Sequence, residues 1–245
     1  MDAEKDNQTS ASDHRADAPG GPSGDTLGGP CGDAPGQVSG TPSTDESARP
    51  GDIADWGSGP PVGSLGEFAV IERLRELLGE PHDDAILKSI GDDAALLSPP
   101  TGGDLIWTCD IQIEGRHFRR EWLTPDEVGA RAAQISVSDV AAMGGVPLGV
   151  LVSLGLPADL RFGALEGVYR GMRRALVPHG TAVIGGNISG AREFSIDLSV
   201  LGWVESDLAL TRDGARPGDQ VYVTGFPGRA AAAVQLLLRG GTSAG

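Results

Sequence analysis

The chain has 245 residues and a formal net charge of −15. That length suits one large domain, or one domain with part of a second. The negative charge excludes nucleic acid and anionic membrane surfaces as main partners, and no apolar run is long enough to span a membrane. We interpret Cys31 and Cys109 as reduced thiols of a cytoplasmic protein.

Residues 1–62 are predicted to be a disordered acidic tail. They are rich in Gly, Pro, Asp and Glu, and few large apolar residues are available to build a core. A solvating extension or a misassigned start codon explains such a tail, and a regulatory role is the alternative.

The first expected helix covers residues 66–79. Its apolar positions recur at steps of three and four residues, and Gly79 follows as a cap. These positions are Phe68, Ile71, Leu74 and Leu78. Residues 85–97 then predict a strand that residues 91–93 interrupt.

Residues 104–111 predict a clear strand. Alternation puts Leu105, Trp107 and Cys109 on one face. Thr108 and Asp110 then share the other face, where a hydroxyl and a carboxylate could bind one ion.

A helix is expected from Thr124 to about Met143, because Thr124 and Glu127 can form a capping box around Pro125. The expected buried stripe consists of Val128, Ala132, Ile135, Asp139 and Met143. Because an acid on an apolar stripe is unusual, Asp139 suggests a metal or phosphate role. The alternative is a buried Asp held by backbone donors or by the hydroxyls of Ser136 and Ser138.

Further alternation predicts strands at 147–156, 181–187, 194–204 and 220–224, with helices at 161–178 and 227–239. The strand at 181–187 is expected to end in Gly185 and Gly186, where backbone N–H groups could approach a phosphate. We divide the folded part into a first domain, 63–205, and the start of a mostly missing domain, 206–245.

Two acidic clusters lie against apolar residues: Asp92 with Asp93, and Asp110 with Glu114. Carboxylates beside strands are costly unless a cation neutralises them. A hard divalent ion such as Mg²⁺, together with a phosphate, meets that need.

In their order along the chain, several segments resemble thiamine-monophosphate kinase, of the superfamily of aminoimidazole-ribonucleotide synthetase and selenophosphate synthetase. The matching segments are 66–68, 90–97, 108–110 with 114–118, 138–144, 169–171, 185–187 and 210–219.

The resemblance implies an α/β fold whose mixed sheet, flanked by helices, forms a barrel across a homodimer, followed by the start of a second α+β domain. It implies that ATP phosphorylates thiamine monophosphate to thiamine diphosphate, with several Mg²⁺ ions and no dedicated general base.

The resemblance also assigns residues. It implies Mg²⁺ binding by Asp93, Thr108, Asp110, Asp139 and the backbone oxygen of Cys109, with Asn187 at a further ligand position. It implies ATP contacts from Tyr169, Gly185, Gly186, Asn187 and Arg212, and a substrate contact from His117. The family usually has Asp at position 187, so we expect weaker metal binding from the uncharged Asn187.

Three other interpretations stay open. The chain could be another ATP-dependent enzyme of the superfamily, although the absence of a Cys just before Asp92 argues against selenophosphate synthetase. It could be a truncated, weakly active or inactive fragment that dimerises and binds nucleotide. It could also be a plain α/β domain whose acids are merely solvated.

Overall fold

The computed structural model describes residues 56–81, 83–223 and 225–240. Most of the predicted tail lies outside these residues. Its last residues are packed, because Trp56 contacts the core and Val62 is buried. The packed part therefore includes residues before the expected boundary at residue 63.

Helices and strands largely occupy the expected positions. In chain order they are the 3-10 helix η1 (Val62–Ser64), α1 (Glu67–Leu78), β1 (Ile86–Lys88), β2 (Leu96–Leu97), β3 (Gly103–Ile113), α2 (Pro125–Ala142), β4 (Val146–Leu156), α3 (Phe162–Leu176), the 3-10 helix η2 (Val177–His179), β5 (Val183–Gly190), β6 (Ser195–Glu205) and α4 (Arg229–Leu238).

A four-stranded mixed sheet organises the fold, with strand order β3-β6-β4-β5. β6 is antiparallel to both of its neighbours, whereas β4 and β5 are parallel. The parallel pair is joined through α3, as a crossover requires. β1 and β2 form a separate antiparallel pair.

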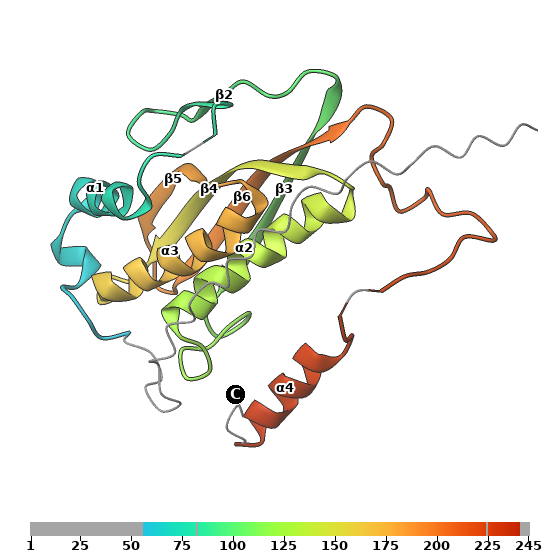
Figure 1. Ribbon diagram of the computed structural model, residues 1–245. Coiled ribbons are helices and arrows are strands. Elements are labelled where there is room, and N and C mark those ends of the chain that lie inside the picture. Colours follow the sequence, from blue (N-terminus) through green and yellow to red (C-terminus); the bar gives the residue numbers. More distant parts are fainter. Residues whose placement is uncertain (1–55, 82, 224, 241–245) are drawn as a thin grey trace, which may run out of the picture. The chain divides into compact units, whose positions relative to one another are not determined.

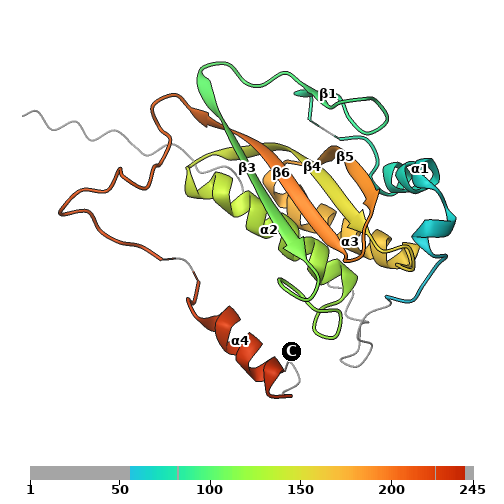
Figure 2. The ribbon, with the colours of Figure 1, turned by 180° about the vertical axis from the view of Figure 1, so that it is seen from behind.

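Helices α2 and α3 pack together and cover one face of this sheet (Figure 1). We call the covered face the inner face and the opposite one the outer face. The outer face is turned toward the viewer in Figure 2. The core lies between the helices and the inner face. It includes Val150, Ile196, Leu198, Val200 and Leu165, which are fully buried.

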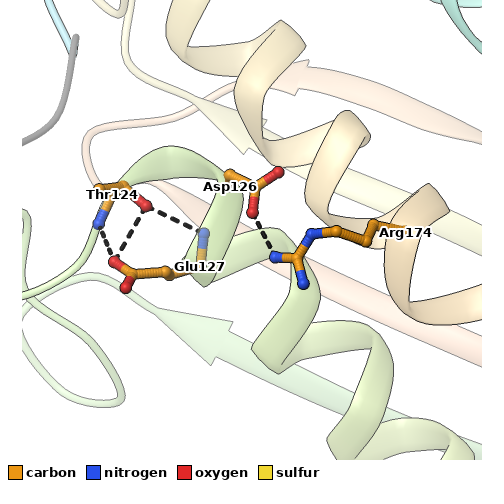
Figure 3. Close-up of polar contacts among 4 residues, drawn as sticks. All are labelled: Thr124, Asp126, Glu127 and Arg174. Atoms are coloured by element: carbon orange, nitrogen blue, oxygen red, sulfur yellow. Dashed lines mark hydrogen bonds and ion pairs between the residues drawn. The ribbon is translucent and has the colours of Figure 1, made fainter. Parts of the chain in front are cut away.

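Helix α2 begins as its sequence predicts. Thr124 Oγ1 accepts a hydrogen bond from the Glu127 backbone N–H at 3.2 Å, and the Glu127 carboxylate accepts from the Thr124 backbone N–H at 2.7 Å (Figure 3). This reciprocal capping box satisfies two N–H groups that the first turn leaves free. Asp126 also forms an ion pair with Arg174 of α3, which ties the two helices together.

Three expectations about local structure are wrong. Phe68 is 89% exposed, so α1 buries Val70, which the expected stripe lacks, together with Leu74, which it contains. The strand at 181–187 does not end at the glycines, because β5 continues to Gly190 through its pairing with β4. The predicted strand at 220–224 is absent from the described residues 220–223, whose alternating side chains are exposed.

Candidate metal and phosphate site

Three predicted residues come together where β3 meets α2. Thr108 and Asp110 share the inner face, as the alternation of β3 predicts. Thr108 Oγ1 donates a hydrogen bond of 2.8 Å to Asp139 Oδ2 of α2. The contact joins residues far apart in the sequence and holds the Asp139 carboxylate at the edge strand of the sheet.

The expectation that Asp139 lies on a buried stripe is wrong. Asp139 is exposed, whereas Val128 and Ala132 are buried as expected, and the helix also buries Ala133, Ser136, Val137 and Val140. The suggested serine donors also bond elsewhere. Ser136 Oγ donates to the Ala132 carbonyl and Ser138 Oγ to the Ile135 carbonyl. Thr108 is the side chain that bonds Asp139.

The electrostatics of Asp110 indicate excess negative charge. Partial burial raises its pKa above the ordinary value, and the nearby carboxylates of Asp139 and Asp197 raise it further. Sequence reasoning missed Asp197, which lies on β6 opposite Ile111. Asp197 occupies a polar position in the alternation of 194–204, and that position was a signal in the sequence. The closeness of Asp197 to Asp110, however, depends on the register between β3 and β6.

This arrangement fits a cation only in part. Oxygen donors beside mutually repelling carboxylates suit Mg²⁺, so Thr108, Asp110 and Asp139 match the expected chemistry. Within residues 56–81, 83–223 and 225–240, no group of three or more His, Cys, Asp or Glu is arranged to hold a metal. The side chains alone therefore do not form a complete metal cage.

The other predicted metal ligands lie elsewhere on the described structure. Asp93 is exposed, and its backbone N–H bonds the carboxylate of Asp92. Cys109 is a free, exposed thiol on the outer face, one residue from Asp110. Asn187 is exposed on β5, and its Nδ2 lies 3.4 Å from Ser189 Oγ. Their roles as ligands stay predictions.

The glycines of β5 have a structural reason beside the predicted phosphate contact. Gly186 has φ +157°, and a Cβ there would collide with the Val152 backbone of β4. Gly185 would bring a Cβ within 2.9 Å of the Leu151 side chain. Close packing against the β4 backbone therefore favours glycine at position 186, whether or not a phosphate binds, whereas at position 185 the flexible end of Leu151 could shift to admit a side chain.

The remaining predicted nucleotide contacts differ in accessibility. Tyr169 is buried in the core, and burial raises the pKa of its hydroxyl. Its side chain is enclosed in the core around α3, and this environment does not favour direct contact with a ligand. Arg212 is exposed in the connector after β6. Nothing in the described contacts joins either residue to Asp110.

His117 lies in the turn between β3 and α2. Its ring Nδ1 accepts a hydrogen bond of 3.0 Å from the Ile113 backbone N–H. In the same turn, Arg120 Nη2 donates to Glu114 Oε2 at 2.7 Å. The ring of His117 is exposed, so a ligand can reach it.

Two cavities in the described structure do not coincide with the carboxylates. One of about 750 Å³ lies between the start of α1 and the end of β5, with Glu67, Ser189 and Arg192 in its lining. A second, of about 500 Å³, includes Asp83, Arg173 and Thr181. Neither includes Asp110 or Asp139. We take the carboxylates as the better marker of chemistry, because their charges interact with one another.

Comparison with known proteins identifies a domain family and a group of relatives. Residues 91–204 match the family model "AIR synthase related protein, N-terminal domain". A thiamine-monophosphate kinase of Aquifex aeolicus is 39% identical over 174 residues, which cover 71% of this chain and 53% of that protein. The chain spans about half the length of the curated relatives it matches.

Solved structures agree in fold. The thiamine-monophosphate kinase of Stenotrophomonas maltophilia matches with a TM-score of 0.61 at 34% identity, covering 72% of this chain and 54% of that one. A structure described as "AaThiL complexed with AMPPCP and TMP" matches with a TM-score of 0.56 at 36% identity, covering 76% and 57%. The expected mixed α/β fold is thereby confirmed.

Proposed function

We propose that this chain, whose residues 91–204 match the N-terminal domain of AIR synthase related proteins, is the nucleotide- and metal-binding part of a thiamine-monophosphate kinase. The observation that carries the proposal is the meeting of Thr108, Asp110 and Asp139 in a chain whose curated relatives bear that name. The reaction is the phosphorylation of thiamine monophosphate to thiamine diphosphate by ATP.

The proposed chemistry follows from charge. Two phosphate groups carry negative charge and repel each other as they approach. Asp110 and Asp139 would hold Mg²⁺, with the Thr108 hydroxyl fixing the orientation of Asp139. Bound Mg²⁺ would supply charge neutralisation and orient the reacting groups. The attacking phosphate oxygen is already ionised near neutral pH, so no general base is assigned.

Several finer roles belong to the same proposal. Asp93, the Cys109 backbone oxygen and Asn187 complete the proposed metal ligands. Gly185, Gly186 and Arg212 are proposed to contact ATP, and His117 the substrate phosphate. Tyr169 would contribute only after a change in the packing around α3.

We also propose a homodimer that uses the outer face. Leu105 and Trp107 of β3 are 55% and 75% exposed there, and they pair in register with Trp203 and Leu201 of β6. Exposed apolar side chains in neighbouring strands form a patch that a second copy could bury. No helix among the described residues is both long and apolar enough to cross a bilayer. A cytoplasmic location stays a prediction.

The first test is ATP-dependent turnover of the full chain with thiamine monophosphate and Mg²⁺, with thiamine diphosphate measured by chromatography. We expect product from the wild type and none from Asp110→Asn or Asp139→Asn. Asp104→Asn is the control, because it removes a carboxylate from the same strand. Bound ATP without product would favour the alternative, a nucleotide-binding fragment that needs further residues for chemistry.

A second test concerns the position where Asp is usual. Asn187 offers an amide oxygen without charge, so Asn187→Asp should lower the Mg²⁺ concentration needed for half-maximal ATP binding or turnover. An unchanged Mg²⁺ titration would contradict this role.

A further inference from the structure

The turn between β3 and α2 fixes the ring of His117 in one orientation. β3 is an edge strand of the described sheet, so the N–H and C=O of Ile113, which point away from β6, have no partner strand among the described residues. His117 bonds both groups, and the C=O also accepts from the Arg116 backbone N–H at 3.1 Å. The His117 backbone N–H donates to the Ile113 carbonyl at 2.8 Å, and the His117 ring Nδ1 accepts from the Ile113 N–H at 3.0 Å.

The second of these bonds determines which ring nitrogen carries the proton. Nδ1 can accept from a backbone N–H only through its lone pair, so it carries no proton. A neutral imidazole then has its proton on Nε2. The bond leaves Nε2–H as the ring's free donor, and a phosphate oxygen is a suitable acceptor for it.

An ion pair closes the turn around this histidine. Glu114 precedes His117 and Arg120 follows it. Two nitrogens of the Arg120 guanidinium contact the two carboxylate oxygens of Glu114, with Nε–Oε1 at 2.6 Å and Nη2–Oε2 at 2.7 Å. The Nε contact is short but not well aligned as a hydrogen bond. Both side chains are partly buried, so this pair is less screened than a fully exposed surface pair.

The closed turn is in turn attached to the core. The Arg120 guanidinium lies 4.9 Å from the centroid of the Trp56 ring. The Trp56 indole N–H donates to the Leu123 carbonyl at 3.1 Å, and its ring packs edge-on against Phe194. Phe118, beside His117, is buried and packs edge-on against the same Phe194. These contacts fix the backbone on both sides of His117.

We infer that Arg120 and Glu114 are positioning residues that hold His117 as its Nε2–H tautomer, so that Nε2–H is the donor to the substrate phosphate. The assignment of phosphate as the acceptor rests on the proposed function. The tautomer and the role of the ion pair rest on contacts within this chain.

The tautomer is measured directly on the full chain without any ligand. Long-range ¹H–¹⁵N spectra separate protonated from unprotonated ring nitrogens, and the chain has only four histidines. Loss of one set of signals in His117→Gln assigns His117. We expect a single tautomer with unprotonated Nδ1. A protonated Nδ1, or a fast mixture of tautomers, in the wild type would overturn the inference.

Arg120→Ala tests the ion pair, with Arg119→Ala as the matched control. Arg119 also lies over a tryptophan, 4.7 Å from the centroid of the Trp122 ring, but it does not close the turn. We expect Arg120→Ala to shift the His117 signals toward a mixture of tautomers, with partial recovery in Arg120→Lys. Equal spectra for the two alanine variants would refute the positioning role. Glu114→Gln removes the same ion pair if Arg120→Ala fails to fold.

The donor itself is tested by two amide substitutions. Gln carries an N–H near the position of Nε2, whereas Asn carries one near Nδ1. We expect His117→Gln to bind thiamine monophosphate within about threefold of the wild type, and His117→Asn to bind roughly tenfold or more weakly. Thiamine, which lacks the phosphate, should not distinguish them. Equal loss in both variants would overturn the Nε2–H assignment. If the wild type binds no thiamine monophosphate, the proposed substrate is wrong, and the spectra alone decide the tautomer and the positioning role.

Discussion

The inner and outer faces of the sheet differ although the same strands form both. On the inner face, Ile196, Leu198 and Val200 of β6 are fully buried under α2 and α3. On the outer face, no helix among the described residues covers β3, and Trp107 and Leu105 are largely exposed. The difference teaches that strand alternation alone does not indicate which side faces the core, because both sides of β3 carry large apolar residues.

The largest expected effect is a loss of stability from a substitution in the core under the inner face. Phe194→Ala removes a fully buried ring that packs against Trp56 and Phe118, so we expect a loss of about 3–5 kcal/mol in the free energy of unfolding. Urea denaturation measures it. Phe68→Ala, at an exposed ring, should change the same quantity by less than about 0.5 kcal/mol. Similar losses in both variants would contradict the inner-face core.

A smaller effect concerns the helix that covers the inner face. Thr124→Ala removes the side-chain acceptor of the capping box and should cost about 1 kcal/mol of stability, measured by urea denaturation. Thr124→Asn should recover most of the loss, because Asn also caps helices well. No loss on removing the hydroxyl would mean that water replaces this cap.

On the outer face, stability and association should separate. Trp107→Ser should change the stability of the isolated subunit by less than about 0.5 kcal/mol, because the ring is exposed. If a second copy covers this face, the same change should abolish the dimer in sedimentation equilibrium. Tyr222→Ser, at another exposed aromatic ring, is the control. Unchanged association in Trp107→Ser would argue against the outer face as the dimer interface.

The smallest expected effect is a gain in stability, and it concerns Asp110 at the edge of the inner face. Because the pKa of Asp110 is raised in the folded protein, its contribution to stability is present at acidic pH and is lost as pH rises through the raised value. Asp110→Asn should therefore melt at a higher temperature than the wild type at neutral pH. The gain should disappear at about pH 3, below the ordinary pKa of aspartate.

Added Mg²⁺ sharpens the same experiment. Mg²⁺ should raise the melting temperature of the wild type more than that of Asp110→Asn, because a bound ligand stabilises the state that binds it. If Asp104→Asn raises the melting temperature without Mg²⁺ as much as Asp110→Asn does, the gain reflects only relief of the protein's general negative charge. Lower stability of Asp110→Asn at neutral pH would contradict the proposed carboxylate repulsion.

The sequence predicted those features that depend on local pattern. Alternation along β3 correctly put Thr108 and Asp110 on one face, and the Thr124–Glu127 spacing gave the start of α2. The expected stripe of α2 was wrong at Asp139, because this helix packs against both α3 and the sheet along a line that the sequence pattern does not reveal. Small residues therefore allow the close approach of these elements. At Gly129, for example, the missing Cβ leaves room for the Val168 backbone.

Features that depend on distant partners could not be predicted. The alternation at 220–223 is typical of a strand, but these residues pair with no strand in the described part of the chain. The effect of Asp197 on Asp110 depends on the register between β3 and β6. The bond from Ile113 to His117 depends on β3 being an edge strand, which only the full strand order reveals.

The position of β6 also has a consequence for how the chain folds. β6 is the last strand of the sheet in the sequence, yet it lies between β3 and β4. During synthesis, β3 emerges before α2, β4, α3 and β5, and it meets its partner only after Glu205 has been made. Such non-local pairing slows folding and leaves apolar strands exposed to aggregation meanwhile. Completion of the sheet should therefore be a late step, and the nascent chain should depend on protection until β6 inserts.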